Sequence, residues 1–403
     1  MKKVLRLALP LLAVMCLSTP PGVLAAGDDL DALRQELKAL RERVVELEKK
    51  LEQSAAAPVQ PAPIGDRAST GVQEPKEDQK GLVSDLEKRI KLYGEVKAWG
   101  QGGSRDNKAD NRKTSTSEIK LRKAEIFMEA QINPWAKGLI HLLWEQDKTE
   151  PVDLDEVYIL LGQTNDVPFY AMAGRIYPAI GHFETFLITD TITREAFETQ
   201  ASALEVGYSL DWINFGLAAF RARTHEISDG EDRKINSYFA HLGLATPEGF
   251  LGDLKLSGHI AYLSNLDSFF IRDQVTDNAV QDLVGAWSVA AKAEYGMFAL
   301  MGEYLRVTDS YKAGALGYAP IGAKPEPYAF NLEAAVKPSA DWTFAVRYEG
   351  SGDLYGQQPE RQWGLGAQWE FLKDTTLGLE YMRGDYQNND TRDLVTTQLA
   401  VKF

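Results

Sequence analysis

The sequence predicts an all-β fold, a closed antiparallel transmembrane β-barrel of about 16 strands, preceded by an α-helical coiled coil. Three observations predict it: strand-length runs with alternating polar and apolar residues, connections that are alternately short and long, and a heptad pattern near the start of the chain. After the first 26 residues the sequence has no long apolar segment. This is compatible with a transmembrane barrel, because the alternation of polar and apolar residues gives each strand a low average hydropathy.

The first 26 residues have the features of a secretory signal peptide. Lys2 and Lys3 precede an apolar stretch over residues 7–17, and the small residues Ala25 and Ala26 mark the expected cleavage site. The single cysteine lies within this leader, so the mature protein would contain no disulfide. Its stability must therefore come from a large core or from a closed barrel.

Residues 27–53 are predicted to form a coiled coil in the periplasm. Apolar residues recur alternately three and four positions apart, at Leu30, Leu33, Leu37, Leu40, Val44, Leu47 and Leu51. Charged residues fill the flanking positions, as expected for a coiled coil. The alternative interpretation of this segment is a single amphipathic helix packed on the barrel. Residues 54–82 are rich in Ala, Pro and Gln, which predicts a flexible linker, and residues 83–403 would then form the barrel.

The candidate strands follow one another to the C-terminus. They are 90–101, 118–132, 137–147, 153–164, 168–177, 200–209, 211–222, 234–246, 252–264, 284–295, 297–307, 327–337, 341–350, 361–371, 374–384 and 393–403. Short turns such as Asn133-Pro134 alternate with long polar stretches, which we expect to be external loops, at 102–117, 178–199, 265–283 and 308–325.

Within the strands, one face suits lipid and the other suits water. In 341–350, for example, Trp342, Phe344 and Val346 share one face, opposite polar residues. The last strand alternates in the same way and ends in Phe403, as is typical of outer-membrane barrels. The polar faces supply candidate pore-lining charges, namely Lys123, Glu125, Arg221, Arg223, Arg347 and Glu349.

The candidate pore constriction is the connection 178–199, which is the third external loop when the shorter connection between 147 and 153 is counted. It is more apolar than the other loops, and such a loop is unfavourable in water, so we expect it to pack inside the barrel rather than against a neighbouring protomer. Arg175 alternates in step with Ala171 and Ala173, which predicts that it faces inward. The candidate constriction residues are Arg175, Tyr177, His182, Phe183, Glu184, Asp190, Arg194, Glu195 and Glu198.

The runs 174–185 and 188–195 resemble the third-loop region of the LbtU-like siderophore porins. The leading coiled coil, the opening strand Tyr93-Gly94-Glu95-Val96 and the terminal Phe are also similar to that family. This resemblance implies a porin of the bacterial outer membrane that takes up ferric siderophores without a plug domain. By analogy with other porins we expect a homo-oligomer, specifically a trimer.

Other functions have little support. The histidines show no Ser-His-acid spacing, so we predict no catalytic residue. His241 and His259 could share the inner face of adjacent strands, which would permit a metal site, but such residues more often simply line the lumen. We therefore predict no metal and no cofactor. The net charge of −14 argues against nucleic acid as a partner. The expected partners are membrane lipid and a small hydrophilic solute. The alternatives are a general or anion-preferring porin, or an envelope tether whose coiled coil contacts the cell wall.

Overall fold

The computed structural model describes residues 89–146, 148–164, 167–229 and 234–403. The predicted signal peptide, coiled coil and linker, including the seam from Leu30 to Leu51, lie outside the described residues. No helix in the described ranges is both long and apolar enough to cross a membrane.

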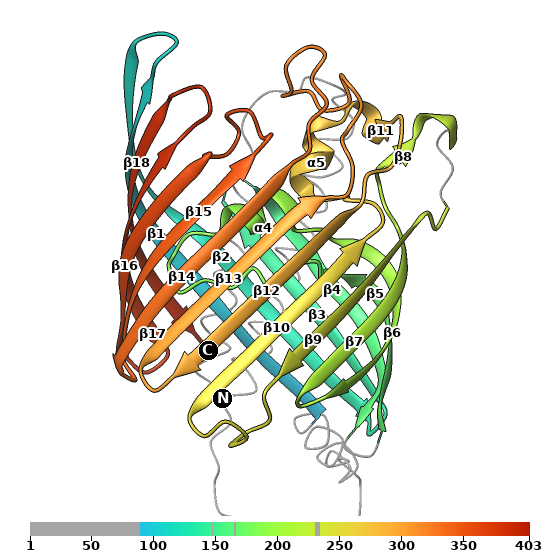
Figure 1. Ribbon diagram of the computed structural model, residues 1–403. Coiled ribbons are helices and arrows are strands. Elements are labelled where there is room, and N and C mark those ends of the chain that lie inside the picture. Colours follow the sequence, from blue (N-terminus) through green and yellow to red (C-terminus); the bar gives the residue numbers. More distant parts are fainter. Residues whose placement is uncertain (1–88, 147, 165–166, 230–233) are drawn as a thin grey trace, which may run out of the picture. The chain divides into compact units, whose positions relative to one another are not determined.

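Sixteen strands in the described residues form a closed antiparallel barrel (Figure 1). They are β1 (Ile90–Asn107), β2 (Arg112–Asn133), β3 (Ala136–Glu145), β4 (Thr149–Thr164), β5 (Val167–Ile176), β6 (Ala201–Leu210), β7 (Ile213–Arg221), β9 (Ser237–Ala245), β10 (Leu254–Leu263), β12 (Ala286–Tyr295), β13 (Phe298–Val307), β14 (Tyr328–Ser339), β15 (Trp342–Gly352), β16 (Arg361–Leu372), β17 (Thr375–Asp385) and β18 (Thr391–Lys402). Each pairs with its neighbours along the chain, and β18 pairs with β1. The predicted barrel is confirmed.

Tight turns join the strands at one end of the barrel, and the longer connections gather at the other end (Figure 1). Two of these long connections contain helices, α4 (Ile192–Phe197) and α5 (Phe269–Gln274). Short strands β8 (His225–Glu226) and β11 (Ala279–Val280) form a separate parallel pair, flanked by the 3-10 helices η1 (Ile227–Asp229) and η2 (Thr276–Asn278).

One predicted loop is wrong. Residues 102–117 do not form an irregular connection, because β1 and β2 continue to pair as far as Asn107 opposite Arg112. The segment is polar on both faces, which suggested a loop, but backbone pairing needs no apolar face and the Ser and Thr residues here are compatible with extended structure. The polar composition therefore marks the part of the hairpin that extends beyond the apolar belt.

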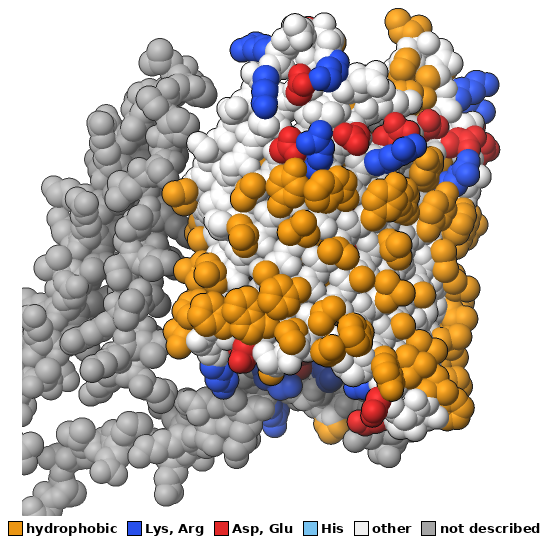
Figure 2. All heavy atoms as spheres, turned by 60° about the vertical axis from the view of Figure 1, so that its left-hand side comes forward, with side chains coloured by type: hydrophobic (Ala, Val, Ile, Leu, Met, Phe, Trp, Pro, Cys, Tyr) orange, Lys and Arg blue, Asp and Glu red, His pale blue; other side chains and the backbone are white. Residues whose placement is uncertain are grey.

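The outer surface of the barrel carries an apolar belt. Figure 2 shows hydrophobic side chains around the middle of the visible face, with charged side chains above and below them. On β15, Phe344 and Val346 are 45% and 56% exposed, whereas the intervening Ala345 is 5% exposed. The predicted face assignment of this strand is confirmed, and the belt is suited to contact with hydrocarbon.

The barrel is closed beside its C-terminal residue. Gly94 and Phe403 exchange two backbone hydrogen bonds, each 3.0 Å from N to O. A Cβ atom on Gly94 would lie 2.4 Å from the carbonyl oxygen of Glu125 and 2.7 Å from the ring of Phe403. Only glycine therefore allows the terminal ring and the two strands to approach this closely.

We predict that Gly94→Ala weakens barrel closure. The added methyl group must displace backbone or the Phe403 ring, and overpacking of this kind costs about 1–3 kcal/mol. The temperature at which folded protein is lost on an unboiled denaturing gel should fall. Gly102→Ala on the same strand is the control, because nothing lies within 4 Å of its added methyl group. Equal thermal resistance of the two variants would contradict the prediction.

Candidate functional site

The connection between β5 and β6, residues 177–200, lies inside the barrel; we call it the inner loop. Its helix α4 contacts β13, β14 and β15 on the wall and α5 above them. Ile180, Ile192 and Phe197 are at most 3% exposed and belong to the same buried cluster as the wall residues Phe220 and Leu305. The apolar side chains that make this loop unfavourable in water thus anchor it within the barrel, as the sequence predicted.

Four wall glutamates, which we call the loop-holding glutamates, bind the backbone of the inner loop. Each is at most 9% exposed. Irregular backbone has N–H groups without partners, and a buried carboxylate needs donors, so each group satisfies the other. The bonds run from His182 N to Glu303 (2.6 Å), Phe186 N to Glu333 (2.7 Å), Ile188 N and Thr189 N to Glu380 (2.6 and 3.1 Å), and Ile192 N to Glu349 (2.7 Å).

Arg347 supplies positive charge among these glutamates. Its Nε donates to Glu333 at 2.8 Å and its Nη1 to Glu349 at 3.3 Å. Its Nη2 also donates to the carbonyl of Thr189 at 2.9 Å. The prediction that Arg347 and Glu349 line a solvated pore is wrong: both face inward, but they are 2% and 0% exposed because the inner loop covers them.

A second group of charges remains accessible to water, and we call it the loop charge cluster: Arg122, Asp190, Arg194 and Glu198. Arg194 donates to Asp190 at 3.2 Å and to Glu198 at 2.8 Å. Arg122 on β2 reaches Asp190 at 3.3 Å and also pairs with Glu145. The four side chains are 13–39% exposed although they lie within the barrel region. They are charges at the inner loop that remain in contact with water.

Arg122 was not among the predicted site residues, because a β-bulge changes the alternation of β2. Lys97 on β1 pairs with Lys123. The next residue, Ala98, pairs with Leu121, which leaves Arg122 as the extra residue. Strict alternation in the sequence places Arg122 on the face opposite to Lys123, and nothing in the residue types marks the bulge.

The surroundings of the loop acids affect their protonation differently. Burial by itself raises the pKa of Asp190, but the guanidinium groups of Arg194 and Arg122 outweigh this effect and hold that pKa below its usual range. Burial raises the pKa of Glu198 to about 6, against the opposing effect of Arg194. Asp190 is therefore ionised at neutral pH, while Glu198 changes charge near pH 6.

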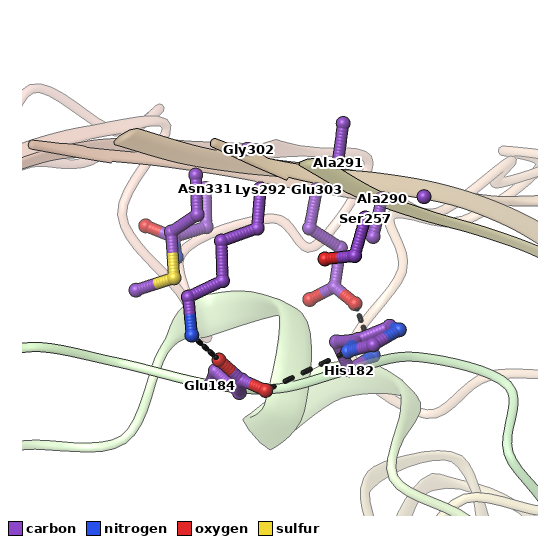
Figure 3. A pocket seen from close by; sticks show the side chains of 11 residues that line it. His182, Glu184, Ser257, Ala290, Ala291, Lys292, Gly302, Glu303 and Asn331 are labelled. Atoms are coloured by element: carbon purple, nitrogen blue, oxygen red, sulfur yellow. Dashed lines mark hydrogen bonds and ion pairs between the residues drawn. The ribbon is translucent and has the colours of Figure 1, made fainter. Parts of the chain in front are cut away.

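Figure 3 shows a small pocket between the inner loop and the wall strands β12 and β13. Lys292 reaches Glu184 at 2.8 Å, and His182 Nδ1 lies 3.7 Å from the same carboxylate. His182 and then Lys292 lower the pKa of Glu184 to about 2. Because the cavity holds only about 20 Å³, it has room for ordered water but not for a solute. We interpret this group as a further anchor of the loop.

The other predicted constriction residues have mixed environments. Tyr177 donates its hydroxyl to Asp155 at 2.7 Å, and Phe183 packs partly buried against the apolar cluster. Glu195 is exposed. Arg175 binds Gln200 at 2.7 Å and Asp153 at 3.0 Å, away from the loop charge cluster.

The inward orientation predicted for Arg175, Arg221 and Arg223 is wrong. On β7 the inner side carries Phe220, which is 1% exposed, and Arg221 shares the outer side with Leu217. Arg223 follows β7 and is exposed like Arg221. On β5 the side chain of Ile176 faces the buried cluster, so the adjacent Arg175 lies on the other face of the strand. The inner loop makes the interior apolar at this level, so polarity no longer identifies the inner face.

Lys123 and Glu125 fit their predicted position on the inner face of β2. Lys123 pairs with Glu125 at 2.9 Å and is 23% exposed. Glu125 is 8% exposed, and its second partner is Nε2 of His141 at 3.1 Å. Of the two, Lys123 is the one that presents charge to the lumen.

Comparisons with known proteins identify the fold. No family model matches the chain. A UPF0422 protein of Coxiella burnetii is 23% identical over 299 residues, 70% of this chain, and the match covers 61% of that relative, less than two thirds of its length.

Three solved structures are similar to the barrel. The outer membrane channel DcaP of Acinetobacter baumannii has a TM-score of 0.52 at 13% identity, covering 78% of this chain and 97% of that one. The anion-selective porin from Comamonas acidovorans has a TM-score of 0.54 at 12% identity, covering 78% and 99%. OmpF of Salmonella typhi, in complex with daunomycin, has a TM-score of 0.53 at 14% identity, covering 78% and 97%. The barrel has the porin fold.

We predict that Glu380→Ala releases the middle of the inner loop from the wall. Two backbone N–H groups and the Thr189 hydroxyl lose their shared acceptor. Charge-assisted hydrogen bonds contribute about 1.5–3 kcal/mol, so amide exchange of Ile188 and Thr189 should accelerate about tenfold or more. Hydrogen exchange with mass spectrometry measures this. Glu370→Ala, which removes only a turn contact to Asp374, is the control and should leave loop exchange unchanged.

Proposed function

We propose that the protein is a channel of the bacterial outer membrane through which small hydrophilic solutes diffuse. The observation that carries this proposal is the inner loop: it is fixed inside an apolar-belted barrel yet presents partly exposed charges. A loop that narrows a barrel while keeping charges wet is suited to selecting solutes by size and charge. The porin fold supports the same proposal.

The loop charge cluster contains both signs of charge, which orients a polar solute as it passes. Arg122 extends from the wall, and Asp190, Arg194 and Glu198 extend from the loop. Charges fixed by ion pairs in a narrow region create a local field that acts on dipoles and ions. We therefore propose that this cluster, rather than the buried Arg347 and Glu349, determines solute preference.

As substrate class we propose ferric siderophores. Support comes from the resemblance of residues 174–185 and 188–195 to the LbtU-like siderophore porins, because these segments, apart from the last three residues of β5, belong to the inner loop. We further propose a homo-oligomer, a trimer by analogy with other porins, with residues 27–53 in the periplasm. Contact of the coiled coil with the cell wall remains a prediction.

Planar lipid bilayers provide the test. Purified protein should produce stepwise conductance in salt solution, and a ferric siderophore added to one side should interrupt the open current. The same chelator without iron is the matched control and should interrupt it less. Absence of conductance from folded protein would contradict the channel, whereas conductance without a difference between the two chelators would contradict only the substrate class.

We predict that ion preference depends on pH through Glu198. Its pKa of about 6 means that the side chain is mostly charged at pH 7 and mostly neutral at pH 5. Loss of this negative charge leaves Arg194 opposed only by Asp190, so the reversal potential in a salt gradient should shift toward anions as the pH falls. Glu198→Gln should show a smaller shift. An identical shift in the variant would assign it to other groups.

A further inference from the structure

A buried histidine on the barrel wall, outside the loop charge cluster, has two carboxylates beside its Nδ1 atom and a third beside its Nε2 atom. His141 on β3 is 5% exposed, and its Nδ1 is 3.1 Å from Asp155 Oδ2 and 3.8 Å from Glu156 Oε2. Despite these short distances, Nδ1 has no hydrogen-bond partner of acceptable geometry and no contact with solvent. A ring nitrogen that is buried, aimed at carboxylates and unbonded is unusual and needs an explanation.

A β-bulge brings the two acids to the same side of the wall. Adjacent residues of a regular strand point to opposite faces. Here His141 pairs with Glu156. The next residue, Leu142, pairs with Leu154, so Asp155 is the extra residue of the bulge. Bulges redirect side chains in this way, and this one places both carboxylates of β4 at a single imidazole.

Neighbouring groups orient these side chains. Glu125 lies 3.1 Å from Nε2 of His141, so Nε2–H can donate to it and leave Nδ1 as the free nitrogen. The Oδ1 atom of Asp155 accepts from the Tyr177 hydroxyl at 2.7 Å and from Gln200 Nε2 at 3.0 Å. Oδ2 of Asp155 is consequently the atom that faces Nδ1.

We propose that His141, Asp155 and Glu156 bind a divalent transition-metal ion, such as Zn²⁺, through Nδ1 and the two carboxylates. The possible ligand atoms all lie within 4.8 Å of one another. Two ligands on one tetrahedral zinc ion, each bonded at about 2.1 Å, are about 3.4 Å apart, close to the observed 3.1 and 3.8 Å. One imidazole and two carboxylates suit such an ion better than Mg²⁺ or Ca²⁺, which prefer all-oxygen sites.

The location indicates what the ion would do. Glu156 is 24% exposed, so an ion can enter from the lumen. Tyr177 and Gln200, which hold Asp155, are the first and last residues of the inner loop. A bound ion would fix Asp155 and, through it, both ends of that loop. It would also neutralise negative charge on the wall near the loop. This structural role of a metal ion is additional to the proposed diffusion of solutes.

The test is metal binding by the full protein in detergent micelles. After treatment with a chelator, protein is titrated with Zn²⁺ by calorimetry, and Co²⁺ is used for its visible absorption spectrum. We expect one equivalent to bind, with a Co²⁺ spectrum that reports nitrogen and oxygen ligands. Glu156→Gln should weaken Zn²⁺ binding about 10-fold or more, and Glu125→Gln, which replaces the carboxylate partner of the ligating ring by a neutral amide, should weaken it about 10-fold.

Glu129→Gln is the matched control. Glu129 lies on the same face of β2 as Glu125, and its side chain is 27% exposed, close to the 24% of Glu156. Its removal should leave Zn²⁺ affinity unchanged. Because the partly exposed Glu156 can lose its charge without leaving a buried ion unpaired, that variant remains informative if a substitution of His141 fails to fold.

Two results would overturn the proposal. One is the lack of saturable one-to-one Zn²⁺ binding by the unaltered, folded protein. The other is binding that Glu156→Gln and Glu125→Gln leave as tight as before. Neither result affects the stepwise conductance measured in the bilayer experiment, so failure of the metal site and failure of the channel are distinguishable.

Discussion

The structure depends on the pairing of buried wall carboxylates with the backbone of the inner loop. A closed barrel satisfies its own backbone, but an irregular loop inside it has N–H groups that no strand pairs with. Glu303, Glu333, Glu349 and Glu380 accept these groups, and Arg347 balances part of their charge. Without this arrangement the loop would carry unpaired polar groups into the interior, at a cost of several kcal/mol each.

This pairing distinguishes two sets of charges at the inner loop with different environments. The loop-holding glutamates and Arg347 are buried and therefore structural. Arg122, Asp190, Arg194 and Glu198 keep partial contact with water, so they can exchange protons with it. The apolar cluster around Phe197 and Phe220 fills the interior on one side, and the partly exposed charges lie where the inner loop approaches β2.

The two bulges described here have the same physical effect. Each inserts one residue into a wall strand and so brings to the interior a side chain that regular alternation would turn outward. The bulge in β2 places Arg122 against Asp190, and the bulge in β4 places Asp155 beside His141. Both sites lie close to the inner loop, one at its charged segment and the other at its two ends. Local irregularity of the wall thus supplies the groups that meet the loop.

The sequence by itself determined the barrel, its strand order and the inner placement of residues 178–199, because alternation, turn spacing and the hydrophobicity of one loop are local properties of the chain. It also selected Asp190, Arg194 and Glu198. It missed Arg122 and three of the loop-holding glutamates, Glu303, Glu333 and Glu380, and misplaced Arg175, Arg221 and Arg223. Only the tertiary structure decides the positions of these residues. A bulge changes the face that a residue occupies, as for Arg122. A loop packed inside makes part of the interior apolar, so polarity no longer distinguishes the inner face of a strand from its outer face.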